Sequence, residues 1–300
     1  MNRVREQLQA AYAYERGYFG ENVGVAVLDS GIAWSHPDLK GRVAEVRYFG
    51  NQGHVQDTCG HGTHISGIIG GNGAASGGRY QGLAPRCHFL SLNVLDAKGN
   101  GKAADVVEAL GWLMEHGAEY QIRIVNISMG GIMGKEEAYE LLQTVEQVWN
   151  AGFLVCAAAG NQGPKRQSIT VPGTSRKIIT VGSSDDQKPV QMSGYQKINY
   201  SGRGPTGACI CKPDVVAPGY RILSCNSKWQ KKGNGFYCAK SGTSMSTPVV
   251  SGALALLLSR QPQLTNKDVK LHLSKTCVDL GFPKNQQGWG MVMIPRLLDE

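Results

Sequence analysis

The chain has 300 residues, 41% of them hydrophobic and 18% charged, with a net charge of +8 at pH 7. This length can bury a substantial core, and because no linker-like segment divides the chain we expect one domain over residues 1–300. No apolar run approaches the roughly 18 residues of a membrane span, and the scattered basic residues form no nucleic-acid motif. We therefore expect neither a membrane nor a nucleic acid as partner.

Residues 1–8 lack the apolar stretch of a signal peptide. If Met1 is the native start, this favours a bacterial cytoplasmic location; a secreted protein remains the alternative if a signal and a pro-segment were removed. The eight cysteines are irregularly spaced and contain no Cys-x-x-Cys motif, so free thiols are expected in a reducing cytosol. Cys225 and Cys238 bracket a polar loop, and a disulfide between them in an oxidising compartment is left open as an alternative.

Along the chain, apolar runs rich in β-formers alternate with helical patterns. Strands are predicted at residues 23–28, 89–95, 123–128, 153–159 and 178–183. Helices are predicted at residues 61–69, 103–116, 135–151, 244–260 and 265–275, the last opened by a capping box of Thr265 and Asp268. Because the strands are continuously apolar, this alternation predicts an α/β fold in which helices cover both faces of a parallel sheet.

Three separate segments carry the residues of a nucleophilic catalyst. They are residues 25–31 with Asp29, residues 60–64 with His61, and residues 241–248 with Ser244. A serine hydroxyl needs a base within hydrogen-bond reach, and that base needs a third group to fix its tautomer. The order Asp, His, Ser is one of the known orders of this triad. His64, one turn after His61, is interpreted as a core histidine.

With these motifs in place, the chain resembles the subtilisin-like serine proteases (subtilases, peptidase family S8) over nearly its full length. Its glycine-rich loop at residues 71–82 is similar to the intracellular AprX-type branch. The resemblance implies a three-layer α/β/α sandwich with a mostly parallel sheet of about seven strands. It also implies Asp29 as the orienting acid, His61 as the general base and then acid, and Ser244 as the nucleophile.

The resemblance also implies an oxyanion hole and two substrate-binding edges. The amide of Asn161 and the backbone N–H of Ser244 would stabilise the oxyanion, with Thr243 as a minor donor. An extended substrate would pair with the edges and pocket walls formed by Gly99, Asn100, Gly101, Ser128, Met129, Gly130, Ala158 and Gly160. The small, apolar walls favour apolar or aromatic P1 side chains. Ala103 and Val106 match positions of an open S4 pocket.

Two residues near His61 have open interpretations. Asp57 matches a family position near the pocket next to the scissile bond, but a surface carboxylate is nearly as plausible. Cys59 is either a small buried residue or a thiol whose modification would block the triad.

No cofactor is expected to be required. Many secreted relatives bind calcium in the loop after the His helix, but here no acidic residue lies between Gly70 and Pro85. Calcium needs about six oxygen ligands, usually including carboxylates. Asp38 matches one family ligand and is left as a weak calcium candidate.

The leading hypothesis is therefore a serine endopeptidase that hydrolyses peptides or unfolded proteins through an acyl-enzyme. A narrow-specificity processing protease, acting on a leader peptide or a spore or germination factor, is the first alternative. The second alternative, from another class, is a pseudoprotease that serves as a binding module. A pro-segment or protein inhibitor outside this chain is a further expected partner.

Overall fold

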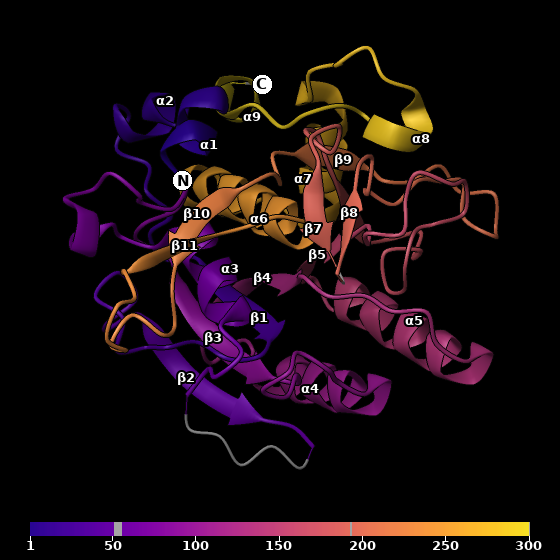
Figure 1. Ribbon diagram of the computed structural model, residues 1–300. Coiled ribbons are helices and arrows are strands. Elements are labelled where there is room, and N and C mark those ends of the chain that lie inside the picture. The colour runs from indigo at the N-terminus through magenta and orange to yellow at the C-terminus, as the bar shows by residue number, and fades with distance from the viewer. Residues whose placement is uncertain (51–55, 193, 300) are drawn as a thin grey trace.

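A seven-stranded parallel sheet forms the centre of the computed structural model, which describes residues 1–50, 56–192 and 194–299 (Figure 1). The strands, in their order across the sheet, are β2 (Val43–Tyr48), β3 (His88–Asn93), β1 (Gly24–Asp29), β4 (Ile122–Ile127), β5 (Leu154–Ala158), β6 (Ile179–Ser183) and β9 (Val215–Ala217). Every neighbouring pair is parallel. After β1 the chain forms β2 and β3 on one side of that strand and then forms β4 on its other side. The carboxyl end of β1 is thus the switch point at which open α/β sheets bind ligands.

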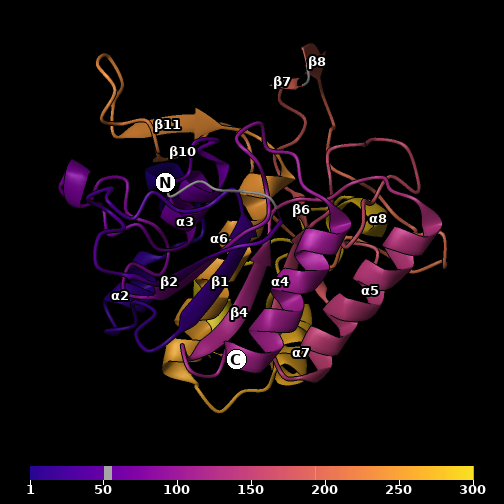
Figure 2. The same ribbon diagram turned by 90° about the horizontal axis from the view of Figure 1, so that it is seen from below.

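Helices cover both faces of this sheet. The helices α3 (His61–Gly70) and α6 (Thr243–Arg260) pack together on one face, and α4 (Ala103–His116) and α5 (Lys135–Asn150) pack together on the other (Figure 2). The expected three-layer α/β/α architecture is therefore confirmed. In the part of the chain that the structure describes, no helix combines the length and the apolar character needed to cross a membrane.

The remaining elements are short and lie around this core. The helical ones are α1 (Asn2–Gln7), α2 (Ala11–Tyr14), a 3-10 turn (Ala74–Ser76), α7 (Asn266–Thr276), α8 (Lys284–Gln287) and α9 (Ile294–Asp299). Two antiparallel hairpins pair β7 (Val190–Met192) with β8 (Tyr195–Lys197) and β10 (Ile222–Cys225) with β11 (Tyr237–Lys240). Both hairpins stand out from the same side of the molecule (Figure 2).

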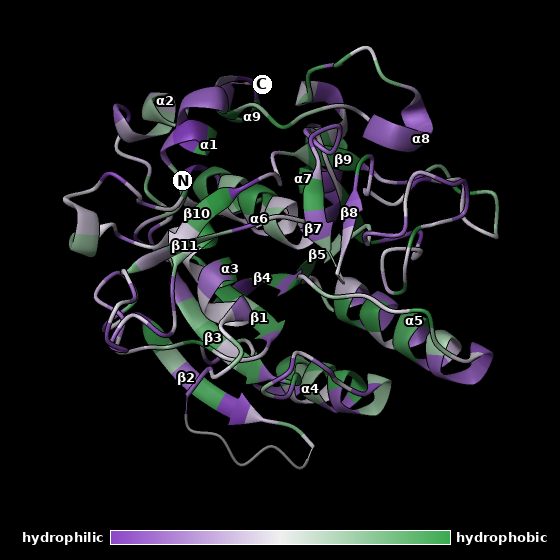
Figure 3. Ribbon diagram, in the orientation of Figure 1, coloured by the Kyte–Doolittle hydropathy of each residue, from purple (hydrophilic) through white to green (hydrophobic). Residues whose placement is uncertain are grey.

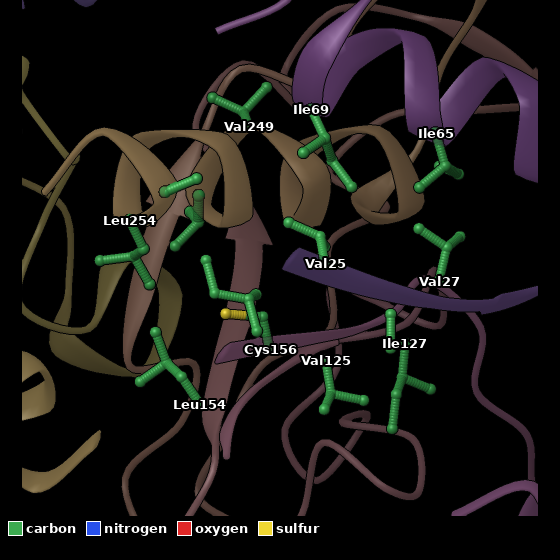
Figure 4. Close-up of a cluster of buried hydrophobic side chains, with 14 of the residues drawn as sticks. Val25, Val27, Ile65, Ile69, Val125, Ile127, Leu154, Cys156, Val249 and Leu254 are labelled. Atoms are coloured by element: carbon green, nitrogen blue, oxygen red, sulfur yellow. The ribbon is translucent and has the colours of Figure 1, made fainter. Parts of the chain in front are cut away.

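The core lies between β1 and its covering helices. Val27 and Val25 of β1 point toward Ile65 and Ile69 of α3 (Figure 4). All six residues of β1 are buried, which accounts for the continuous apolar run in the sequence. The central strands are mostly hydrophobic, whereas α8 and the far end of α5 are hydrophilic (Figure 3). Asp29 is thus a charged group at the end of a buried strand, where it needs hydrogen-bonding partners.

The ten elements predicted from the sequence are present, with ends that shift by a residue or two. The capping box is confirmed, because Asp268 N donates to Thr265 Oγ1 at 3.2 Å and Thr265 N donates to Asp268 Oδ2 at 3.0 Å. Strands β2 and β9 and both hairpins were not predicted. β2 is a half-exposed edge strand without a clear apolar run, and β9 has only three residues.

All eight cysteines are free thiols in the structure. In the β10–β11 ribbon, Cys225 pairs with Tyr237 and Cys238 pairs with Ser224. Residues offset by one position point to opposite faces of a ribbon, so the two sulfur atoms are directed apart. The disulfide left open for Cys225 and Cys238 is therefore not formed.

Candidate active site

His61 and Asp29 are brought together at the carboxyl end of β1. Asp29 is the last residue of β1 and His61 the first of α3, and His61 Nδ1 lies 2.8 Å from Asp29 Oδ1 and 2.9 Å from Oδ2. Asp29 is fully buried, and Ser30 N also donates to its Oδ1 at 2.8 Å. A carboxylate can only accept here, so Nδ1 carries the proton and Nε2 is left as the basic nitrogen.

A glycine permits this close approach of helix and strand. A Cβ atom at Gly62 would overlap the carbonyl oxygen of Gly31 and come within 3.0 Å of Asp29 Cβ. Any larger residue would push α3, and His61 with it, away from β1. Gly62 therefore keeps His61 within hydrogen-bond distance of Asp29.

Ser244 lines the same cleft as His61 and Asn161, a cavity of about 500 Å³. It is the second residue of α6, so its N–H is one of the groups at a helix start that have no acceptor within the helix. The neighbouring serines differ: Ser241 Oγ accepts a hydrogen bond from Arg221 N, and Ser246 is buried. Pro248 is the sixth residue of α6, in its second turn.

Asn161 is oriented by Thr243. Asn161 Oδ1 accepts from Thr243 N at 3.0 Å and from Thr243 Oγ1 at 3.1 Å. Because a backbone N–H can only donate, the oxygen of the carboxamide must face Thr243, and its NH₂ group is turned the other way. The Thr243 hydroxyl thus contacts Asn161 itself and orients its carboxamide; the minor oxyanion contact expected of Thr243 stays a prediction.

A second buried carboxylate, Asp57, ties the two halves of the site together. Its Oδ1 accepts from Ser30 Oγ at 2.9 Å and Gly60 N at 2.7 Å, and its Oδ2 accepts from Thr63 N at 2.9 Å and Thr63 Oγ1 at 2.6 Å. Asp57 is only 4% exposed, which excludes the surface alternative. These bonds hold the first turn of α3 against the residue that follows Asp29.

The residues expected to bind substrate lie around His61 and Ser244, with one exception. Those that line the main cleft are Gly99, Ser128, Met129, Gly130, Ala158 and Gly160. Gly101 lines an adjoining cavity. Asn100 lines neither space among the described residues; its N–H donates to Asp96 Oδ1 in an exposed turn. Cys59 is half-buried and lines the main cleft beside His61.

Known proteins resemble this chain over most of its length. The family described as Subtilase family matches residues 20–290. The chain belongs to the subtilase family. It is 40% identical to the serine protease AprX of Bacillus subtilis over 266 residues, an aligned region that covers 84% of this chain and 60% of AprX. It is 34% identical to subtilisin E of Bacillus subtilis over 277 residues, which cover 92% of this chain and 65% of subtilisin E.

Solved structures agree on the fold. Sphericase superimposes with a TM-score of 0.77 at 27% identity, and the S41 psychrophilic protease with a TM-score of 0.74 at 27% identity, each over 92% of both chains. The chain spans less than two thirds of the length of AprX and subtilisin E. The family, the fold and the predicted resemblance are thus confirmed.

Two cavities of this subtilase have the character of side-chain pockets. In the main cleft Gly130 and Gly160 both lie against Thr170, and a Cβ atom on either glycine would overlap Thr170 Oγ1. The adjoining cavity, about 160 Å³, is mostly apolar. Its lining includes Ala103, Val106, Met129, Met133, Leu141 and Val171. Ala103 and Val106 thus line one apolar cavity, and their assignment to an S4 pocket stays a prediction.

The main cleft is also lined by three lysines that no sequence pattern singles out, namely Lys98, Lys197 and Lys240. Lys197 is the last residue of strand β8, and Lys240 is the last residue of strand β11. Neither hairpin was predicted, so no local pattern could have placed these side chains at the site.

Asp38 lies in a buried cluster with His36 and Cys225, whose potential ligand atoms are within 4.8 Å of one another. Its Oδ1 accepts from Ala75 N at 2.9 Å and its Oδ2 from the Tyr237 hydroxyl at 2.8 Å. His36 Nδ1 accepts from Asp38 N at 3.1 Å. Hydrogen-bond donors rather than oxygen ligands surround this carboxylate, so the cluster does not fit a calcium ion.

His64 is a structural histidine. It is fully buried, and its Nε2 lies 3.0 Å from Ile222 O and 3.1 Å from Cys238 O. Both partners are carbonyls, so Nε2 carries the proton. Burial lowers the pKa of His64 to about 3, which keeps the ring neutral and unsuited to exchange protons with a substrate.

Proposed function

We propose that this subtilase is a serine endopeptidase that cleaves polypeptides through an acyl-enzyme formed on Ser244. The observation that carries the proposal is the His61–Asp29 contact at 2.8 Å in the cleft that Ser244 also lines. The relatives named above as a serine protease and a subtilisin support it.

In this reaction Ser244 Oγ attacks the carbonyl carbon of the scissile bond, and His61 Nε2 takes the hydroxyl proton. Asp29 keeps the other ring nitrogen protonated and stabilises the imidazolium that forms. The C–N bond then breaks as His61 gives its proton to the leaving amine. A water molecule attacks the acyl-enzyme by the same route and regenerates Ser244.

The negative charge that develops on the carbonyl oxygen would be stabilised by two donors. One is the NH₂ group of Asn161, oriented by Thr243; the other is the backbone N–H of Ser244 at the start of α6. Loss of one such donor typically lowers kcat about 10²–10³-fold. The N-terminal end of an α-helix adds positive potential at the same point.

The substrate would lie extended between residues 99–101 and 128–130, where backbone can pair with backbone. Uncharged walls of Ser128, Gly130, Ala158 and Gly160 favour an apolar or aromatic P1 side chain. The apolar cavity beside them favours an apolar P4 side chain.

Active-site labelling tests the proposal. The protein is incubated with a sulfonyl fluoride and its intact mass is measured beside that of Ser244→Ala. A single adduct on the wild type that is absent from the variant is expected. An unlabelled wild type that also cleaves no unfolded protein would overturn the proposal and favour a binding module.

A further inference from the structure

The main cleft carries positive charge that the proposed chemistry does not use. Its lining includes Lys98, Lys197 and Lys240, and no Asp or Glu among the residues that the structure describes. A peptide that enters the cleft therefore meets cationic side chains close to the scissile bond.

Two of these lysines are held beside the proposed catalytic residues. Lys240 Nζ donates at 3.0 Å to the carbonyl oxygen of Gly60, the residue directly before His61. Lys197 Nζ donates to the carbonyl oxygen of Asn161 at 3.3 Å. Both side chains are half-buried. In the described parts of the chain neither ammonium pairs with a carboxylate; since an ammonium has three N–H donors, each keeps donors for a ligand.

The neighbours of these lysines place them at the leaving-group half of the cleft. In the proposed reaction His61 protonates the leaving amine, and Asn161 contacts the carbonyl oxygen of the bond that breaks. The residues before that bond would lie along the glycine edges, 99–101 and 128–130. Lys240 and Lys197 instead end the strands β11 and β8, whose hairpins stand out from the same side of the molecule (Figure 2).

Lys98 has a different environment. It is exposed and directly precedes Gly99, on the edge that would hold the residues before the scissile bond. Asp96 shares its turn, and Asp96 Oδ1 accepts from Lys98 N at 2.8 Å. Because Lys98 lies on the other edge of the cleft from the proposed leaving-group half, it can serve as a control for general positive charge in the cleft.

We propose that Lys197 and Lys240 give this enzyme a preference for substrates with acidic side chains at the first two positions after the scissile bond. The inference rests on the proposed function. Ion pairs in water are weak, but both amines are half-buried and substrate covers them further, so screening is reduced. Two such pairs are expected to raise kcat/KM about tenfold over an uncharged substrate of the same shape.

Paired quenched-fluorescent peptides test the preference. Both have Phe before the scissile bond; one has Glu and the other Gln at the next two positions. The wild type should cleave the Glu peptide with about tenfold higher kcat/KM, and the ratio should fall as salt is raised. In Lys197→Met/Lys240→Met the ratio should approach one, whereas Lys98→Met should keep the wild-type ratio.

The ratio of kcat/KM for the Glu peptide to that for the Gln peptide distinguishes a role of the lysines in substrate selectivity from a role in holding Gly60 and Asn161 in place. If Lys240 only held Gly60, its loss would lower kcat/KM for both peptides equally and leave the ratio unchanged. Equal cleavage of the two peptides by the wild type would overturn this inference and leave the proposed function intact. Cleavage of neither peptide, with no sulfonyl adduct, would overturn both.

Discussion

Replacement of Asp57 by asparagine should impair both stability and catalysis, because this carboxylate connects the supports of two triad residues. It accepts four hydrogen bonds, two of them from the backbone N–H groups of Gly60 and Thr63, which flank His61. A third comes from Ser30, next to Asp29. An asparagine side chain offers one acceptor oxygen and places an NH₂ group where the other oxygen was.

The magnitude follows from that exchange. The Ser30 and Thr63 hydroxyls can turn to accept from the new NH₂ group, but one of the two backbone N–H groups is left facing a donor. The variant loses a hydrogen bond to a charged group, about 1.5–3 kcal/mol, and buries an unpaired N–H, about 1–3 kcal/mol. We expect Asp57→Asn to lower the free energy of unfolding by about 3–5 kcal/mol.

The catalytic effect comes through His61. Release of Gly60 or Thr63 loosens the first turn of α3, and small displacements of a catalytic group can cost up to about 10²-fold in rate. We expect kcat to fall about 10- to 100-fold with little change in KM. Stability is measured by urea unfolding of the two proteins in a Ser244→Ala background, to avoid self-digestion, and kcat by peptide hydrolysis in the active background.

Asp38→Asn is the matched control, since it neutralises another fully buried carboxylate whose bonds go to Ala75 and Tyr237 rather than to the triad. It should leave kcat near the wild-type value. An Asp57→Asn variant with wild-type kcat would refute the positioning argument, and one with wild-type stability would refute the hydrogen-bond accounting.

Three further predictions concern other parts of the site. Thr243→Val, which removes one of the two donors to Asn161 Oδ1, should lower kcat about 3- to 10-fold at unchanged KM in peptide hydrolysis, while Thr243→Ser stays close to wild type. Gly130→Ala should narrow the proposed P1 pocket, because the new Cβ atom overlaps Thr170 Oγ1. The variant should lower kcat/KM about tenfold more for a peptide with Phe at P1 than for a peptide with Ala at P1. Equal losses for the two peptides would contradict the placement of Gly130 in the P1 pocket. Burial lowers the pKa of His64 from 6.5 to about 3 in the folded protein, so between these pH values the unfolded chain binds a proton that the folded protein does not. The free energy of unfolding should therefore fall as the pH is lowered from 6.5 toward 3, by at most about 1.4 kcal/mol per pH unit for this group. Urea unfolding measures this slope, and His64→Gln should remove the contribution of His64 to it.

The proposed triad could be selected from the sequence because its residues lie at or next to the ends of regular elements. Asp29 ends an apolar strand, and His61 and Ser244 open helices, so each comes with a local pattern and a glycine that permits close approach. Asp57 shows the limit of this reasoning. Its position was noted, but whether it was buried depended on Ser30, Gly60 and Thr63 converging on it, and no local pattern encodes that convergence.

The hairpins mark a second limit. Strands β7 and β8 have three residues each, too few to show the alternation that predicts a strand. Their place beside the cleft involves long-range contacts such as the one between Lys197 and Asn161. β11 is likewise placed by bonds between residues far apart in the chain, among them Lys240 to Gly60 and Cys238 to His64.

This division has a functional consequence. The proposed catalytic groups are fixed by elements whose burial the whole fold requires, so substitutions that move them should also cost stability, as argued for Asp57. Lys197 and Lys240 lie instead on two-stranded hairpins that protrude from the sheet, and each is attached to the site by a single hydrogen bond to a carbonyl. A protein built this way can change its substrate preference through the hairpins at a smaller cost to the proposed catalytic groups than a substitution of Asp57 carries, because each lysine contributes one hydrogen bond to Gly60 or Asn161 whereas Asp57 accepts four.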